Sequence, residues 1–213
     1  MTELIIPSLL ESLYMVFFST IFSLLLGFPL GILLVITEKG SIWEKPLLNN
    51  ILNSIINILR SFPFLILMIL LFPLSSLIIG KSIGTTATIV PLSIAAAPFV
   101  ARVMESSLKE VDKGVVELSL SMGARTSQII SKVLIPEALP SIVLGITLTI
   151  INLIGYSAMA GAIGGGGLGD LAIRYGLYRF QTDVMIVSVI IIIILVQSVQ
   201  FIGNTLAAKI NKK

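Results

Sequence analysis

The sequence contains neither cysteine nor histidine, and only 12% of its 213 residues are charged, compared with about 25% in an average soluble protein. Without these two residue types the chain has no imidazole base, no thiol nucleophile, no disulfide and no His or Cys ligand for a metal. Hydrophobic residues make up 56% of the chain, more than a soluble domain of this size can bury. We therefore expect a membrane protein without cofactor or metal, and not a soluble enzyme.

Five stretches of the chain lack any charged residue, and each is about 18 residues long or longer. A helix of this length can cross the bilayer core, and it satisfies its own backbone hydrogen bonds in lipid. The sequence therefore predicts an all-α integral membrane protein with a single transmembrane domain over residues 1–213. The five predicted spans are 13–36, 62–79, 83–101, 138–163 and 184–208.

The basic residues are distributed unequally between the two sides of these spans. Connections on one side hold 11 of the 14 Lys and Arg residues, namely Lys39, Lys45, Arg60, Arg102, Lys109, Lys113, Arg125, Lys132, Lys209, Lys212 and Lys213. The other side holds Lys81, Arg174 and Arg179. Because cytoplasmic connections carry the excess of Lys and Arg, we expect the loop 102–137 and the C-terminus in the cytoplasm and the N-terminus outside. The net charge of +3 then indicates orientation and not a nucleic-acid partner.

The predicted spans contain no Asp, Glu, Lys, Arg or His, which argues against transport driven by a bound proton or sodium ion. Their few amide side chains either form hydrogen bonds between helices or contact a substrate. These amides are Asn152, Gln197, Gln200 and Asn204. Gly27 and Gly31 form a GxxxG pair around Pro29, which allows close helix approach and a kink.

Prolines interrupt the second and third predicted spans, at Pro63, Pro73, Pro91 and Pro98. Broken helices leave backbone carbonyls free and are often found where a helix bundle lines a pathway. This pattern favours a transport protein over a passive membrane anchor.

Eight of the 17 glycines lie between residues 155 and 176, at the outer end of the fourth predicted span. Part of this run fits the GxGxxG pattern, but no strand precedes it, so we exclude a dinucleotide site. Glycine adopts dihedral angles that other residues avoid, which predicts an outer loop able to change shape against a ligand or a partner. This loop comprises Gly164, Gly165, Gly166, Gly167 and Gly169. Just before it, Met159 either fills a constriction in a pathway or packs in the ordinary way.

The loop 102–137 carries five basic and five acidic residues and is the largest segment outside the spans. Asp112 is placed to cap a helix over 113–122, and Gly123 to end that helix in the left-handed conformation. Thr126 is placed to cap a second helix that stops before Pro136. The first helix carries an apolar stripe, which is covered either by the ends of the chain's own spans or by a cytoplasmic protein partner.

From Glu117 the chain reads Glu-Leu-Ser, three residues, Gly123, nine residues and then Val-Leu-Ile-Pro136. This pattern resembles the "EAA" loop of ATP-binding-cassette import permeases, which reads Glu-Ala-Ala, three residues, Gly, nine residues and Ile-x-Leu-Pro. The departures are Leu118, Ser119, Val133 and Ile135, all compatible with a helix. The segments RSFPF (60–64), AAAPF (95–99), PEALP (136–140) and GYSAMAG (155–161) extend the likeness to methionine-import permease subunits over nearly the whole chain.

The resemblance implies a type I importer permease in the bacterial cytoplasmic membrane, working as a homodimer with two cytoplasmic ATPase subunits and an external substrate-binding protein or lipoprotein. It implies that the EAA helix docks on the ATPase, that a constriction lies near Met159, and that the glycine-rich loop faces the binding protein. The implied coupling residues are Glu117, Leu118, Ser119, Ser121, Met122, Gly123, Ala124, Arg125 and Pro136. The implied pathway residues are Asn152, Tyr156 and Met159.

Three other functions stay open from the sequence: a permease for another amino acid or a betaine-like osmoprotectant, a passive channel, and a membrane scaffold. The EAA spacing argues against the channel and the scaffold. Because the chain has no nucleotide-binding loop and no catalytic group, we expect a non-catalytic transport subunit whose partner hydrolyses ATP.

Overall fold

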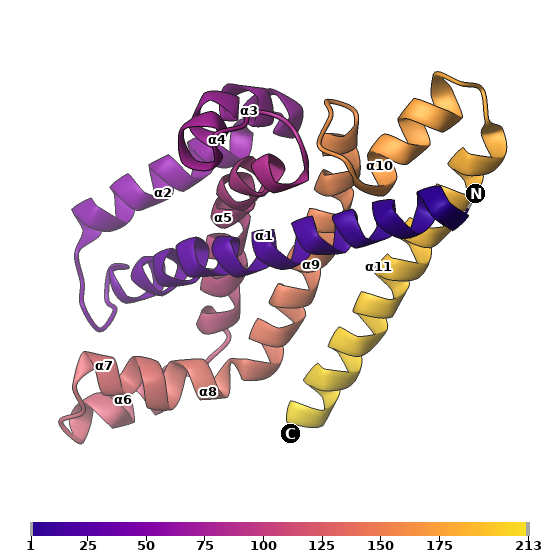
Figure 1. Cartoon of the computed structure of the whole chain (residues 1–213). Coiled ribbons are helices and arrows are strands. Elements are labelled where there is room, and N and C mark those ends of the chain that lie inside the picture. The colour runs from indigo at the N-terminus through magenta and orange to yellow at the C-terminus, as the bar shows by residue number, and fades with distance from the viewer. Residues whose placement is uncertain (1, 212–213) are drawn as a thin grey trace.

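The computed structural model describes residues 2–211, and every regular element in that range is a helix (Figure 1). Met1, Lys212 and Lys213 lie outside the described residues, so two basic residues that we counted at the C-terminus are not placed. Within this range, four helices are long and apolar enough to cross a membrane. They are α1 (Thr2–Ile36), α5 (Thr85–Lys109), α9 (Leu139–Gly161) and α11 (Thr182–Ile210). The expected all-α membrane architecture is confirmed.

The segment of the second predicted span is not a single helix. Residues 62–79 form α3 (Phe64–Leu70) and α4 (Phe72–Ile79), and each of these helices is only about 10–12 Å long. Before them lies α2 (Pro46–Ser61), which we did not predict, and the axis bends by 101° between α2 and α3. The bend occurs where Phe62 adopts an extended conformation before Pro63, as residues preceding proline commonly do. A fifth crossing therefore requires the bent pair α2 and α3, and the expected boundaries 62–79 were wrong.

The third predicted span, in contrast, is not interrupted. Pro91 and Pro98 lie inside the continuous helix α5, and both are buried. Each proline removes one backbone hydrogen bond, but the close packing of α5 against α1 offsets that loss.

The helices α1 and α5 form the most extensive helix pair of the fold, and they run in the same direction. A Cβ on Gly27 would lie 2.5 Å from the carbonyl oxygen of Ala97 and 2.6 Å from the Cβ of Val100. One turn later, a Cβ on Gly31 would lie 2.6 Å from the Cβ of Met104. The GxxxG pair therefore packs within one chain, and α1 continues as a helix through this segment.

The substitution Gly27→Ala should lower the free energy of unfolding by about 1–3 kcal/mol, because the added methyl group overpacks the α1–α5 contact. The matched control is Gly155→Ala in α9, where a Cβ would meet nothing within 4 Å. That control should be neutral or slightly stabilising, since alanine favours helix over glycine. The melting temperatures of the two variants in detergent test this. Equal melting temperatures would contradict the close α1–α5 packing.

The connections gather at two ends of the molecule. The turn between α1 and α2, the segment 110–138 and the end of α11 lie toward one end (Figure 1). The short helix α10 (Gly167–Leu171) and the start of α11 lie toward the other end, close to the start of α1 (Figure 1). The segments before and after α9 therefore lie at opposite ends of the molecule.

Candidate functional site

The clearest candidate for a functional element is α6 (Lys113–Ser121), a short helix with well-defined ends. The Asp112 side chain accepts a hydrogen bond from the backbone N–H of Gly114 at 2.6 Å, which confirms the predicted N-cap. At the other end Gly123 has a φ of +77° in open space, which confirms the predicted left-handed residue. The N–H of Ala124 then bonds to the carbonyl of Ser119 at 3.1 Å, so the chain reverses tightly after α6.

The apolar side chains of α6 are largely uncovered by this chain. Leu118 is 62% exposed and Met122, directly after the helix, is 80% exposed. Behind α6, a pocket of about 440 Å³ that is open to the surface separates the helix from the turn between α1 and α2. Protein interiors are close-packed, so a gap of this size leaves α6 weakly supported by its own chain. The sequence left two ways to cover the apolar stripe of α6, namely the ends of the chain's own helices or a protein partner. The helix ends of this chain leave Leu118 and Met122 exposed.

The second helix of this segment differs from our prediction at both ends. The N-cap is Arg125 and not Thr126: the backbone N–H of Arg125 donates to the Gln128 Oε1 at 2.8 Å, and Thr126 is the first residue of α7 (Thr126–Ile129). The helix also does not stop before Pro136. A π-helix, η1 (Ile130–Leu134), carries the chain into α8 (Ile135–Glu137) and on to α9. The wider π turn accommodates a residue that lacks an N–H, so Pro136 lies exposed within a helical path.

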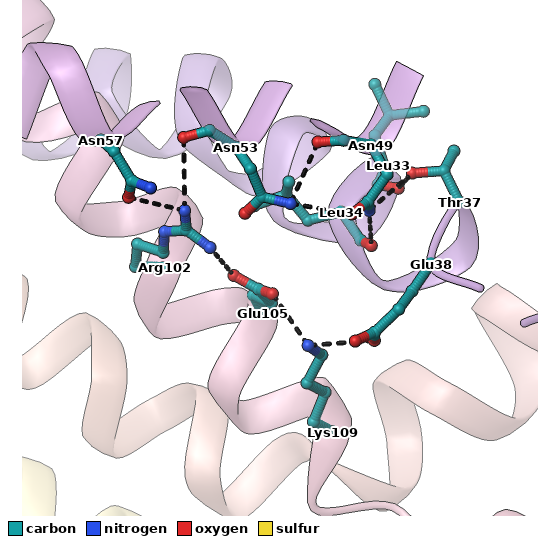
Figure 2. Close-up of polar contacts among 10 residues, drawn as sticks. All are labelled: Leu33, Leu34, Thr37, Glu38, Asn49, Asn53, Asn57, Arg102, Glu105 and Lys109. Atoms are coloured by element: carbon teal, nitrogen blue, oxygen red, sulfur yellow. Dashed lines mark hydrogen bonds and ion pairs between the residues drawn. The ribbon is translucent and has the colours of Figure 1, made fainter. Parts of the chain in front are cut away.

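A network of charged side chains joins the C-terminal ends of α5 and α1 (Figure 2). Glu105, whose side chain is only 11% exposed, accepts from Arg102 at 2.6 Å and from Lys109 at 3.0 Å. Lys109 also contacts Glu38, after the end of α1, at 3.0 Å. Each charge of the network therefore faces an opposite charge, as partly buried ions require.

The same network extends to α2 through amide side chains (Figure 2). Arg102 donates to the Oδ1 of Asn57 at 2.8 Å. Asn49 donates to the carbonyl of Leu34 at 2.7 Å and also to the hydroxyl of Thr37. Asn49, Asn53 and Asn57 recur every four residues and so lie on one side of α2. We did not predict this network, although the four-residue spacing of the asparagines was a usable signal for a helix that packs through a polar face.

The predicted pathway residues lie on one face of α9. Asn152, Tyr156 and Met159 are spaced by four and three residues, and Met159 is 50% exposed. The ring of Tyr156 stacks on Phe64 of α3, with a centroid distance of 4.2 Å and an interplanar angle of 7°. The structure thus brings α3, the first part of the broken segment, against the α9 face that carries Met159. Two of the other amides within the predicted spans bond to each other along one helix: the Gln200 side chain donates to the Asn204 Oδ1 within α11.

The glycine-rich loop is packed against the N-terminal parts of α1 and α5. The N–H of Gly167 donates to the Glu11 Oε2 at 2.7 Å, and the N–H of Leu168 donates to the Ser12 hydroxyl at 2.9 Å. Gly166 and Gly167 both have a φ of +80°, a conformation that other residues rarely adopt. The hydrogen bonds to Glu11 and Ser12 were not foreseen, because they join positions 156 residues apart.

Within the described part of the chain, no three acidic, His or Cys residues are grouped to hold a metal ion.

Comparison with known proteins finds similarity over most of the chain. Residues 27–213 match the protein family described as "Binding-protein-dependent transport system inner membrane component". The chain is 49% identical over 212 residues to the "Probable D-methionine transport system permease protein MetI" of Vibrio cholerae serotype O1, covering 100% of this chain and 94% of that protein. It is 48% identical over 181 residues to the "Methionine import system permease protein MetP" of Bacillus subtilis, covering 85% of this chain and 82% of that protein.

Solved structures show the same relationship. The structure "Inward facing conformations of the MetNI methionine ABC transporter: CY5 native crystal form" contains a chain that superposes with a TM-score of 0.98 at 42% identity. That superposition covers 100% of this chain and 98% of the other. A chain of the "Crystal structure of an amino acid ABC transporter with histidines" has a TM-score of 0.80 at 20% identity, a likeness of fold alone.

Proposed function

The chain belongs to the family of binding-protein-dependent transport system inner membrane components, and from that premise we propose that it is the permease subunit of an ATP-driven methionine importer. Two methionine permeases that match 100% and 85% of this chain at 49% and 48% identity support this substrate. Two copies of the chain work with two ATPase subunits and an external substrate-binding protein, in the bacterial inner membrane. The permease supplies the path for the substrate, and its ATPase partner hydrolyses ATP.

The observation that carries the proposal is the exposed helix α6, which ends at a left-handed glycine and has the EAA spacing. A ligand shifts a conformational equilibrium only if it interacts differently with the two states. The ATPase therefore needs a surface on the permease that it can hold and move, and the exposed apolar side chains of α6 offer one. The coupling residues lie on or after this helix: Glu117, Leu118, Ser119, Ser121, Met122, Gly123, Ala124 and Arg125. Pro136 lies where this segment leads into α9.

The predicted orientation fits this assignment. In it, α6 and the turn between α1 and α2 face the cytoplasm, where the ATPase is, and the glycine-rich loop faces the external binding protein. The excess of Lys and Arg on the α6 side supports it.

The face of α9 that carries Asn152, Tyr156 and Met159 is the proposed pathway, with Met159 as a gate at the end nearest the glycine-rich loop. Methionine has a flexible side chain that can fill an irregular gap. Met159→Ala should therefore raise leakage of labelled methionine through the complex without ATP, while ATP hydrolysis stays near the wild-type rate. Leakage in that variant no faster than in wild type would remove Met159 from the gate.

Uptake into lipid vesicles tests the substrate. Vesicles containing the permease and its ATPase, supplied with the cognate binding protein, should accumulate labelled methionine. An excess of unlabelled methionine should compete, whereas other amino acids and betaine should not. Accumulation of another solute without accumulation of methionine would show that the substrate assignment is wrong.

A further inference from the structure

The glycine-rich loop is held in place by direct contacts with α1 and α5. Gly166 leaves no room for a side chain, because a Cβ there would lie 2.8 Å from Glu11 Oε2 and 2.7 Å from the Thr85 hydroxyl. A Cβ on Gly167 would lie 2.6 Å from the Ser12 hydroxyl. The glycines of this loop thus permit close packing, and the two hydrogen bonds from its backbone to Glu11 and Ser12 fix its position on α1.

The helix to which the loop is fixed is itself joined to α5 along its length. Gly27 and Gly31 bring the two backbones into close contact in the middle of the pair. At the inner end, Glu38 and Lys109 form an ion pair at 3.0 Å. Only residues 110–112 separate the end of α5 from the start of α6. One packed unit therefore leads from the glycine-rich loop through α1 and α5, and this three-residue connection joins it to α6.

We propose that Glu11 is a positioning residue that fastens the glycine-rich loop to the α1–α5 pair, so that a partner bound to this loop displaces α6 on the opposite side. The inference rests on the proposed function, which places the binding protein against the loop and the ATPase against α6. Closely packed helices move as rigid elements, and a displacement at one end of such a pair reaches the other end. The Glu11 carboxylate is the only charged group among the described residues that bonds to the loop backbone at Gly167.

The test compares three variants of the assembled permease–ATPase complex in lipid vesicles. Glu11→Leu removes the acceptor for the Gly167 N–H, whereas Glu11→Gln keeps an oxygen in that position. Glu3→Leu is the matched control, because Glu3 is an exposed carboxylate of the same helix with no bond to the loop. The readouts are ATP hydrolysis without the binding protein, its stimulation by the binding protein, and methionine uptake.

We expect Glu11→Leu to keep its basal ATP hydrolysis but to lose about tenfold in stimulation and in uptake, the scale of one lost charge-assisted hydrogen bond. Glu11→Gln should retain more than about half of the wild-type stimulation, because a neutral hydrogen bond replaces the charged one. Glu3→Leu should behave as wild type. Normal stimulation in Glu11→Leu would overturn the proposal. An equal loss of stimulation in Glu11→Gln and Glu11→Leu would also overturn the proposal. The negative charge of Glu11 would then contribute to recognition of the partner, and the hydrogen bond would not position the loop.

If the Glu11→Leu permease fails to assemble with the ATPase, the Ser12→Ala variant tests the same fastening of the loop to α1. This variant removes the acceptor for the Leu168 N–H and should lower stimulation about threefold at unchanged basal hydrolysis. Unchanged stimulation in Ser12→Ala would overturn the proposal as well. Failure of the proposed function looks different: the wild-type complex itself would then show neither stimulation by the binding protein nor methionine uptake.

Discussion

Replacing Gly123 by aspartate should abolish ATP-driven uptake while the permease still inserts in the membrane and assembles as a dimer. Gly123 has a φ of +77°, a conformation that costs a residue with a side chain roughly 1–2 kcal/mol. A Cβ there would meet nothing within 4 Å, so the rest of the fold is not disturbed. The strain and the new charge fall on the turn that ends α6, where the ATPase is proposed to dock. Uptake should fall below about a tenth of the wild-type rate, which corresponds to roughly 1.4 kcal/mol of lost coupling.

The structure offers a matched control for this substitution. Gly80 follows α4 with a φ of +78°, and a Cβ there would also meet nothing within 4 Å. Gly80→Asp therefore carries the same backbone strain and the same added charge, but it lies away from α6. We expect Gly80→Asp to keep at least about half of the wild-type uptake, because surface substitutions of this kind have small effects. Equal loss of uptake in both variants would mean that strain alone, and not docking at α6, explains the effect.

Replacing Glu105 by alanine should destabilise the permease more than any other single charge removal at this end of the molecule. The Glu105 side chain lies between Arg102 and Lys109, so its loss leaves two neighbouring cations without their shared partner. Removing one member of a buried ion pair typically costs about 3–5 kcal/mol. We expect the melting temperature in detergent to fall by about 10 °C, the scale of such a loss in a chain of this length.

Glu110→Ala is the control for this prediction. Glu110 lies directly after the same helix, but it is exposed and takes part in no ion pair among the described residues. Its replacement should change the melting temperature by about 2 °C or less, as is usual for an exposed charge. Equal melting temperatures for the two variants would show that the network around Glu105 contributes no stability.

Features determined by neighbouring residues could be predicted from the sequence. The α6 segment is the clearest case, because the Asp112 cap and the left-handed Gly123 are both local effects of residue type. The four long helices were also predictable, because an uncharged apolar run of about 18 residues or more indicates a membrane-spanning helix. The error at Pro91 and Pro98 arose because proline weakens an isolated helix, whereas in α5 tight packing by α1 outweighs that weakness.

Features that depend on distant residues were not predictable. The helix α2 was missed because its asparagines lower its hydropathy, and only the contacts of Asn49 with α1 and of Asn57 with Arg102 explain them. The glycine run was interpreted as freedom to change shape, and nothing near it in sequence indicated that Glu11 bonds to it. Hydropathy alone also placed the second crossing at 62–79, because the apolar residues of α3 and α4 outweigh the break at Pro63.

ATP-driven import is measured by the ratio of internal to external methionine in vesicles that contain the permease, its ATPase and the binding protein. We expect a ratio well above one with ATP, a ratio near one with a non-hydrolysable analogue, and a ratio near one with ATP when the permease carries Gly123→Asp. Methionine that equilibrates equally fast with and without ATP hydrolysis, and never rises above the external concentration, would contradict this expectation and would indicate a passive channel.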